Sequence, residues 1–135
     1  MYSEFTILIA DRNRHVREFL RRELLADEYR VEVAKDGREL LMMIDVDKPP
    51  DLLILDLDIP FVGGVVLLER LKDQVPSLPI VIHSFLTEYS NHPAVQQVAA
   101  FVEKRGNIDR LKAVVLDVLR KRYPTRFQLV QGNGQ

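Results

Sequence analysis

The chain has 135 residues, of which 47% are hydrophobic and 29% charged, with a formal net charge of −1 and no cysteine. These values are typical of one folded domain with a hydrophobic core, and they exclude disulfides, thiol chemistry and zinc sites built on cysteine. Because there is no overall basic field, no apolar run near the ~20 residues that cross a bilayer, and no secretion signal at the start, we expect a cytoplasmic protein whose domain binds neither nucleic acid nor membrane.

Five apolar segments alternate with helical patterns along the chain. Strands are predicted at residues 5–10, 29–34, 52–56, 80–84 and 100–103. Apolar residues recur at helical spacing over about 14–27, 38–46, 64–73, 93–98 and 108–122. The second strand alternates apolar and polar residues, which indicates an edge strand with one exposed face. Strands that alternate with helices imply right-handed crossovers, and therefore an α/β fold with a parallel sheet.

The helical pattern stops after Arg122. Pro124 and the run Gly132-Asn133-Gly134 predict an exposed tail or the start of a linker over residues 123–135, which leaves 1–122 as the domain. The basic residues 120–122 lie at the carboxyl end of the last predicted helix, where cations are favourable, so we interpret them as helix-end charges.

Chemically active side chains lie at the carboxyl ends of four of the predicted strands: Asp11 and Lys104 directly follow their strands, and Asp56 and Ser84 end theirs. The carboxyl ends of parallel strands meet at one edge of a sheet, so we expect these four side chains to lie together. A carboxylate can attack phosphorus to form an acyl phosphate, and a cation and a hydroxyl can stabilise the phosphoryl oxygens. A second carboxylate would help to hold a magnesium ion. The sequence therefore predicts a site for phosphoryl transfer.

The chain resembles the receiver domain of two-component response regulators from residue 4 to about residue 122. The matching segments are 7–11, 51–60 together with Gly64, 79–84 and 101–104. Each segment alone is a weak signal, but four in order at the family's spacing are a strong one. The resemblance implies a flavodoxin-like, doubly wound parallel sheet of five strands in the order 2-1-3-4-5, with five helices.

The resemblance also implies a role for each site residue. Asp56 would be the phosphoacceptor, Lys104 would pair with the phosphoryl group, and Ser84 would be the switch hydroxyl. Phe101 lies where the family often has an aromatic rotamer switch. The phosphoryl donor would be a histidine kinase or a phosphotransfer protein. The output would be a downstream effector protein or domain, or a homodimer formed through the fourth helix, fifth strand and fifth helix.

The family's Mg²⁺ site is altered in this chain. The resemblance implies that Asp11, Asp56 and the backbone carbonyl of Asp58 hold the ion, but the second acid that usually follows the first strand is replaced by Arg12. A guanidinium cannot coordinate a metal, so we expect weakened or absent Mg²⁺ binding, with Arg12 pairing instead with Asp56 or Asp11. Two further departures border the site, at Phe85 and at residues 105–106.

The residues leave other interpretations open. Asp11 is also a suitable N-cap for the first helix. A degenerate receiver that binds partners without phosphorylation is an alternative that Arg12 favours. The sequence Asp56-Leu57-Asp58 also fits a haloacid dehalogenase-type phosphohydrolase, although that motif normally begins a longer chain. As a receiver, the chain would be no enzyme beyond its own phosphorylation and dephosphorylation.

Overall fold

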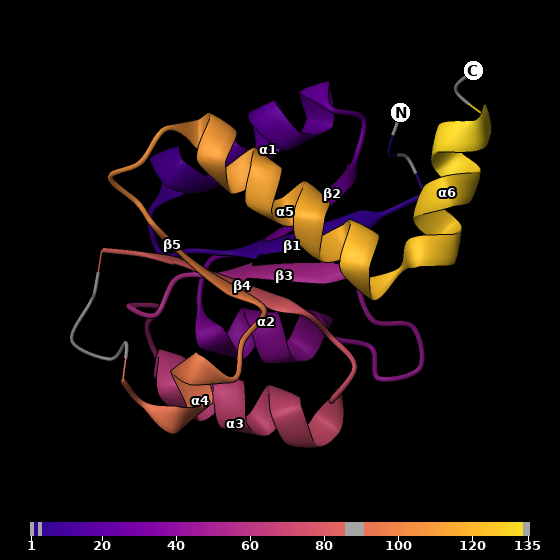
Figure 1. Ribbon diagram of the computed structural model, residues 1–135. Helices are drawn as coiled ribbons and strands as arrows, with labels where there is room; N and C mark the ends of the chain where they lie inside the picture. The colour runs from indigo at the N-terminus through magenta and orange to yellow at the C-terminus, as the bar shows by residue number, and fades with distance from the viewer. Residues whose placement is uncertain (1, 3, 86–90, 134–135) are drawn as a thin grey trace.

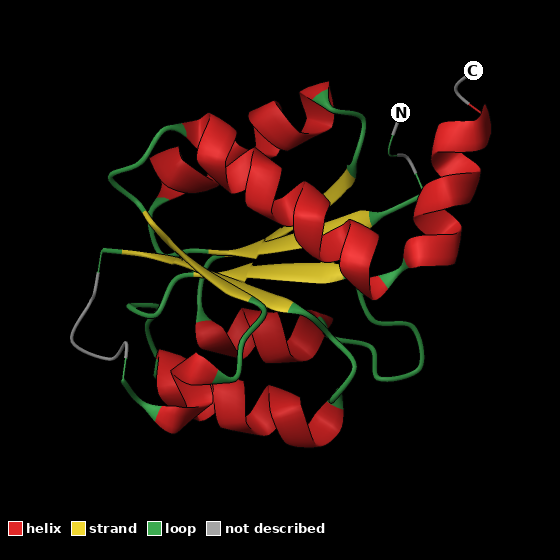
Figure 2. Cartoon of the chain, in the orientation of Figure 1, coloured by secondary structure: helices red, strands yellow, loops and turns green. Residues whose placement is uncertain are grey.

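Five parallel strands form the middle layer of the computed structural model, which describes residues 2, 4–85 and 91–133 (Figures 1 and 2). The strands are β1 (Thr6–Ala10), β2 (Arg30–Ala34), β3 (Leu52–Leu55), β4 (Ile80–Ser84) and β5 (Ala100–Glu103). Their order is β2-β1-β3-β4-β5, and every neighbouring pair is parallel. The predicted α/β class, the strand order and the edge position of the second strand are confirmed.

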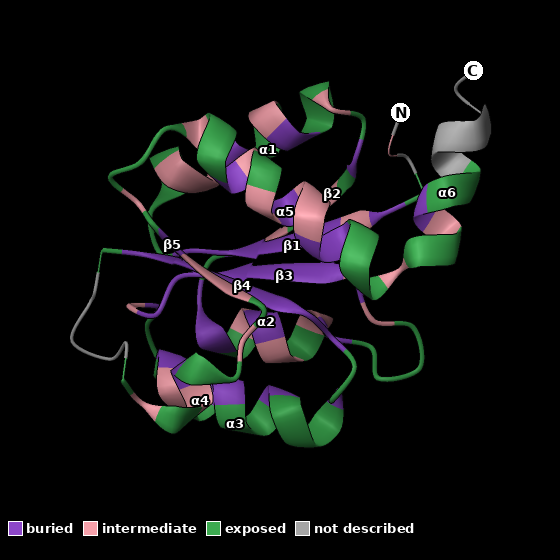
Figure 3. Ribbon diagram, in the orientation of Figure 1, coloured by how far each residue is buried: buried purple, intermediate pink, exposed green. Residues whose placement is uncertain are grey.

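Two hydrophobic cores lie on opposite faces of the sheet. Consecutive side chains of a strand point to opposite faces, and the central strands are apolar at nearly every position because both faces are covered. Leu8, Leu53 and Ile82 belong to the core on one face. Ile9 and Ile54 belong to the other core, together with residues of the first and fifth helices. The central strands β1, β3 and β4 are accordingly buried over nearly their whole length, whereas the edge strands β2 and β5 are partly exposed (Figure 3).

The helices divide between the two faces of the sheet. Helices α1 (Arg14–Ala26) and α5 (Ile108–Arg122) cover one face, and α2 (Gly37–Met43), α3 (Gly64–Gln74) and α4 (Pro93–Gln96) cover the other (Figure 1). The side chain of Asn13 caps α1, and the side chain of Asn107 caps α5. The N-cap role that Asp11 could have taken therefore belongs to Asn13. Helix α4 ends at Gln96, two residues before the predicted end at about residue 98. Among the described residues, no helix is both long and apolar enough to cross a membrane.

A close backbone approach fixes the start of α3 beside the end of β3. A Cβ added at Gly64 would lie 2.6 Å from the carbonyl oxygen of Leu57 and 2.7 Å from its Cα. Only glycine allows the helix to begin this close to the residue that follows Asp56. The contact holds the loop after β3 against α3 and so helps to position the carboxylate.

A sixth helix, α6 (Pro124–Asn133), occupies the segment that the sequence predicted to be a tail, so the expectation of five helices was wrong. Tertiary contacts stabilise it. The ring of Phe127 is buried and stacks on Tyr2 at a centroid distance of 6.0 Å, and the Arg126 guanidinium contacts Asp51 at 2.6 Å. The helix lies at the amino end of the sheet, opposite to the end where β3 and β4 finish (Figure 1).

Candidate functional site

The four residues that the sequence singled out meet at the carboxyl edge of the sheet. Asp11 and Asp56 directly follow β1 and β3, Ser84 ends β4, and Lys104 directly follows β5. Backbone hydrogen bonds continue the strand pairing beyond the strand ends, because the Asp56 N–H donates to the carbonyl of Ala10 at 2.9 Å and the Lys104 N–H donates to that of Ser84 at 3.2 Å. The main chain therefore sets where each side chain starts.

A lysine ammonium joins the two aspartates. Lys104 Nζ lies 2.7 Å from Asp11 Oδ2 and 3.4 Å from Asp56 Oδ2. The two carboxylates are 2% and 1% exposed, and the lysine side chain is 6% exposed. Charges buried this deeply persist only when they are paired, and here the lysine is the partner of both acids.

Every carboxylate oxygen of the pair has an N–H partner. Asp11 Oδ1 accepts from the Asn13 N–H at 2.8 Å, and Asp56 Oδ1 accepts from the Asp58 N–H at 3.0 Å. Asp56 Oδ2 accepts from the Arg12 N–H at 3.5 Å in addition to its lysine contact. These donors orient both carboxylates toward the lysine. Burial raises the pKa of Asp11, and the neighbouring Asp56 charge adds to this effect, whereas the lysine and the Asn13 N–H act against it.

Arg12 lies on the open side of the carboxylates. Its guanidinium NH2 lies 3.4 Å from Asp58 Oδ2, and its Nε lies 4.0 Å from Asp56 Oδ2. The predicted approach to Asp56 is present, but the shorter contact is with Asp58, whose side chain is 28% exposed. The arginine side chain is 54% exposed, so water screens these contacts.

The residues present fit a magnesium ion poorly. Mg²⁺ prefers oxygen ligands in nearly ideal octahedral geometry, and only Asp11, Asp56 and the Asp58 carbonyl are candidates. The Lys104 ammonium already contacts both carboxylates, and a guanidinium lies within 4.0 Å of Asp56. Across residues 2, 4–85 and 91–133, no group of three or more His, Cys, Asp or Glu side chains is placed to hold a metal. A divalent ion would have to displace the lysine or act against two cations.

Ser84 and Phe101 point to the same face of the sheet, as the switch prediction requires. Ser84 follows Ile82 by two residues on β4, and Ile82 is directly opposite Phe101 on β5. Ser84 is completely buried, whereas Phe101 is only half-buried and packs against the core on the α2, α3 and α4 face. Whether the two side chains move together stays a prediction.

His83 is a buried residue next to the site that the sequence analysis did not single out. The imidazole is 9% exposed, and its Nδ1 is buried with no hydrogen-bond partner among the described residues. Burial, with a smaller contribution from the Lys104 charge, lowers the pKa of His83 to about 4. The imidazole lines a small cavity of about 130 Å³ between α1 and α5, beside Phe19 and Phe85. The available signal was a histidine between Ile82 and Ser84 in an otherwise apolar strand.

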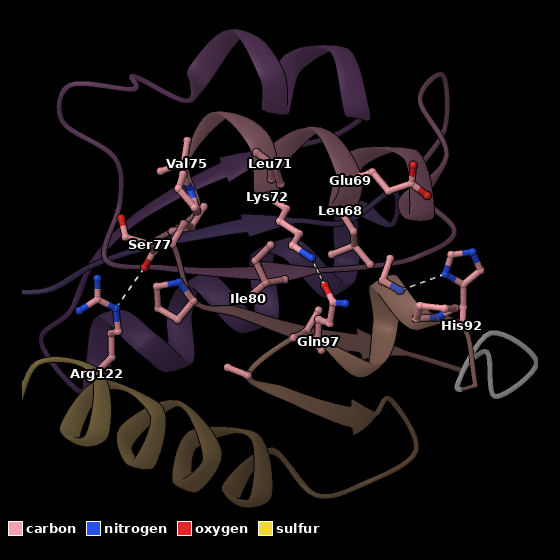
Figure 4. Close-up of a pocket in the computed structure, with 17 residues that line it drawn as sticks. Leu68, Glu69, Leu71, Lys72, Val75, Ser77, Ile80, His92, Gln97 and Arg122 are labelled. Atoms are coloured by element: carbon pink, nitrogen blue, oxygen red, sulfur yellow. Dashed lines mark hydrogen bonds between the residues drawn. The ribbon is translucent and has the colours of Figure 1, made fainter.

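One cavity of the molecule does not contain the site. It has a volume of about 630 Å³ and lies between α3, α4 and the start of β4 (Figure 4). Lys72 pairs with Gln97 across it, and Arg122 Nε donates to the carbonyl of Ser77 at 3.1 Å at one end. None of the four predicted site residues lines this cavity.

Comparisons with known sequences agree with this geometry. A family model described as the response regulator receiver domain matches residues 7–116. The response regulator MprA of Mycolicibacterium vanbaalenii is 34% identical over 120 residues, which cover 87% of this chain and 52% of that protein. MprA of Mycobacterium tuberculosis is 35% identical with the same coverage. The chain thus spans about half the length of the curated relatives that it matches.

Solved structures show the same fold. The response regulator TrrA from Thermotoga maritima, in complex with Mg²⁺ and BeF, has a TM-score of 0.78 and 25% identity and covers 84% of this chain and 98% of its own. NtrX from Brucella abortus, in complex with ATP, has a TM-score of 0.80 and 27% identity and covers 90% of this chain but 28% of its own.

Proposed function

The chain belongs to the response regulator receiver domain family of phosphorelay signal transduction, and we propose that Asp56 is its phosphoryl acceptor. The observation that carries the proposal is the buried Asp56 carboxylate, whose Oδ2 lies 3.4 Å from Lys104 Nζ at the carboxyl edge of the sheet. An Asp56 oxygen would attack the phosphorus of a donor phosphohistidine. The phosphorus–nitrogen bond would break as the phosphorus–oxygen bond forms, and the imidazole would leave with the electron pair of the broken bond.

Lys104 would contribute the positive charge that the transferred group needs. The phosphoryl oxygens carry negative charge throughout the transfer, and a desolvated ammonium stabilises that charge more than a hydrated one would. The lysine side chain is already held at the two aspartates, so little reorganisation is required. Asp11 would help to keep the ammonium in place.

Phosphorylation would act by shifting an equilibrium between two conformations. Ser84 would bond a phosphoryl oxygen, and the half-buried Phe101 would turn further inward on the same face of the sheet. The altered surface would comprise α4, β5 and α5, where an effector or a second copy of the chain would bind. A histidine kinase or phosphotransfer protein would supply the phosphoryl group.

Magnesium would bind weakly at this site. Asp11, Asp56 and the backbone carbonyl of Asp58 are the oxygens that would hold it, and Lys104 and Arg12 oppose it. The degenerate and phosphohydrolase alternatives gain no support from the comparisons, which match response regulators.

The test is mass spectrometry of the intact protein after incubation with acetyl phosphate, both with Mg²⁺ and with a chelator. We expect the mass of one labile phosphoryl group on the wild type and none on Asp56→Asn. Asp58→Asn is the matched control, because it removes a neighbouring carboxylate whose side chain is more exposed. A phosphoryl group that maps to another residue, or none under either condition, would refute the proposal.

A further inference from the structure

Two cations face the acceptor carboxylate, and together they offset most of the negative charge of the carboxylates around it. Asp56 Oδ2 lies 3.4 Å from Lys104 Nζ and 4.0 Å from Arg12 Nε. Asp11, Asp56 and Asp58 carry three negative charges, and the lysine and the arginine carry two positive ones. A divalent cation would therefore give this group of side chains a net positive charge.

The backbone of Arg12 is held in place, whereas its guanidinium is exposed enough to change position. Its backbone N–H lies 3.5 Å from Asp56 Oδ2, and the next residue, Asn13, caps α1. The backbone of Arg12 is therefore fixed beside the acceptor. The side chain is 54% exposed and rests on Asp58, which is itself partly exposed, so the guanidinium can change partners at low cost.

The geometry of a guanidinium suits the product of the reaction. A phosphoryl group on Asp56 Oδ2 would project its oxygens into the space between Lys104 and Arg12, because both cations already contact that oxygen. Arginine binds phosphate oxygens through two parallel N–H donors, whereas lysine acts as a point charge. The group that approaches Asp56 at 4.0 Å before transfer could thus bind two phosphoryl oxygens after it.

We propose that Arg12 serves as a resident cation, so that Asp56 accepts a phosphoryl group from a small acyl phosphate without a divalent metal. The inference rests on the proposed function of Asp56 as acceptor. With acetyl phosphate, the Asp56 oxygen forms the new bond to phosphorus, the bond between phosphorus and the acetyl oxygen breaks, and acetate leaves with the electron pair. Arg12 releases Asp58 and binds the phosphoryl oxygens, while Lys104 keeps its contact with Asp11.

The experiment measures the rate of phosphorylation by acetyl phosphate in EDTA and in Mg²⁺, followed by intact mass. The wild type should react at similar rates under the two conditions. Arg12→Gln removes the charge and should slow the reaction in EDTA by about tenfold or more, as the loss of a donor to a developing oxyanion does. Arg12→Asp should react only with Mg²⁺. Arg14→Gln is the matched control, because it removes the same charge from an exposed position nearby and should leave the rate unchanged.

A second measurement avoids turnover. Beryllium fluoride mimics a phosphoryl group on a carboxylate, and its binding in EDTA can be followed by the backbone NMR signals of Asp56 and Arg12. Wild type should bind it and Arg12→Gln should bind it at least about tenfold more weakly, for the same reason. Phosphorylation of the wild type only with Mg²⁺, or an Arg12→Gln variant as fast as the wild type in EDTA, would overturn the role of Arg12 and leave Asp56 as acceptor. Absence of phosphorylation in every variant would overturn both.

Discussion

At the amino end of the sheet, Asp51 forms an ion pair with Arg126. Asp51 Oδ1 lies 2.6 Å from Arg126 NH1, and Asp51 Oδ2 accepts from the Thr6 N–H at 2.7 Å. At the carboxyl end, two deeply buried aspartates depend on the single buried ammonium of Lys104. The amino end is thus satisfied locally and packs against α6, whereas the carboxyl end keeps a crowded set of charges.

The residues that surround the two ends of the sheet differ in the same way, since those at the amino end pack well and those at the carboxyl end include polar groups that are poorly satisfied. Around α6 the rings of Tyr2, Phe5, Tyr123 and Phe127 contact one another, and such contacts add to area burial. Around the carboxyl end, the buried Nδ1 of His83 has no hydrogen-bond partner in the part of the chain that the structure describes, and Asp11 has a raised pKa. Strained polar arrangements of this kind cost stability and are typical of functional sites. We infer that the amino end supports the fold and the carboxyl end supports the switch.

If the amino end supports the fold and the carboxyl end supports the switch, the largest loss of stability should come from a substitution at Phe127. Its buried ring should make Phe127→Ala lose about 3–4 kcal/mol of the free energy of unfolding, the usual cost of removing a buried phenyl ring. The same variant should still be phosphorylated on Asp56 at low temperature, where it remains folded. Urea unfolding measures the first effect and intact mass the second. Leu129→Ala is the control on the same helix, because Leu129 is 62% exposed and should cost under about 0.5 kcal/mol.

The carboxyl end was easier to predict from sequence than the amino end. The topology alone brings together Asp11, Asp56, Ser84 and Lys104, because each lies at the carboxyl end of a strand. Helix α6 has no comparable signal, because its stability comes from residues far away in sequence. Arg126 contacts Asp51, and the Tyr123 hydroxyl donates to the Asp51 carbonyl at 2.8 Å. Such partners are visible only once the chain is folded.

Arg12 shows where the prediction of the site reached its limit. Its position after β1 placed it near the carboxylates, but the choice of partner depends on side-chain conformation. Asp58, for which the resemblance implied a role only through its backbone carbonyl, is the closer contact at 3.4 Å. Likewise, the burial of His83 Nδ1 without a hydrogen-bond partner among the described residues depends on how α1 and α5 pack beside it, which no spacing in the sequence encodes.

The next largest effect tests the shared lysine. Lys104→Met keeps most of the volume but leaves Asp11 and Asp56 without their buried cation, which should cost about 3 kcal/mol at pH 7. The loss should shrink as the pH falls, because the folded protein can then hold a proton on Asp11 that the unfolded chain does not. Adding Asp11→Asn to this variant should restore part of the stability. A loss that is independent of pH would mean that packing, not charge, is what Lys104 provides.

His83 predicts a smaller effect that depends on pH. The pKa of His83 is about 4 in the folded protein, against the ordinary value of 6.5 that applies in the unfolded chain. Between these two pH values the unfolded chain therefore binds a proton that the folded protein does not. The free energy of unfolding should therefore decrease as the pH falls from about 6.5 to about 4, on the order of 2 kcal/mol in total. Urea unfolding of His83→Gln, which is neutral throughout, should lack this contribution. The difference between the two proteins should be constant above pH ~7.

The smallest effect concerns Arg12 in the absence of metal. Arg12→Asp places a third carboxylate beside Asp56 and Asp58 and removes the cation that contacts both, so it should destabilise the folded state. Because the arginine side chain is 54% exposed, the loss should be under about 1 kcal/mol and should decrease with added salt. Mg²⁺ should reverse it, since the new acid supplies the oxygen ligand that the site lacks. Thermal unfolding of wild type, Arg12→Gln and Arg12→Asp, each with EDTA or Mg²⁺, measures all three effects. If Mg²⁺ stabilises the wild type as much as Arg12→Asp, then Arg12 does not oppose the metal. Arg12 would then be a locally paired surface charge, as Arg126 is at the amino end.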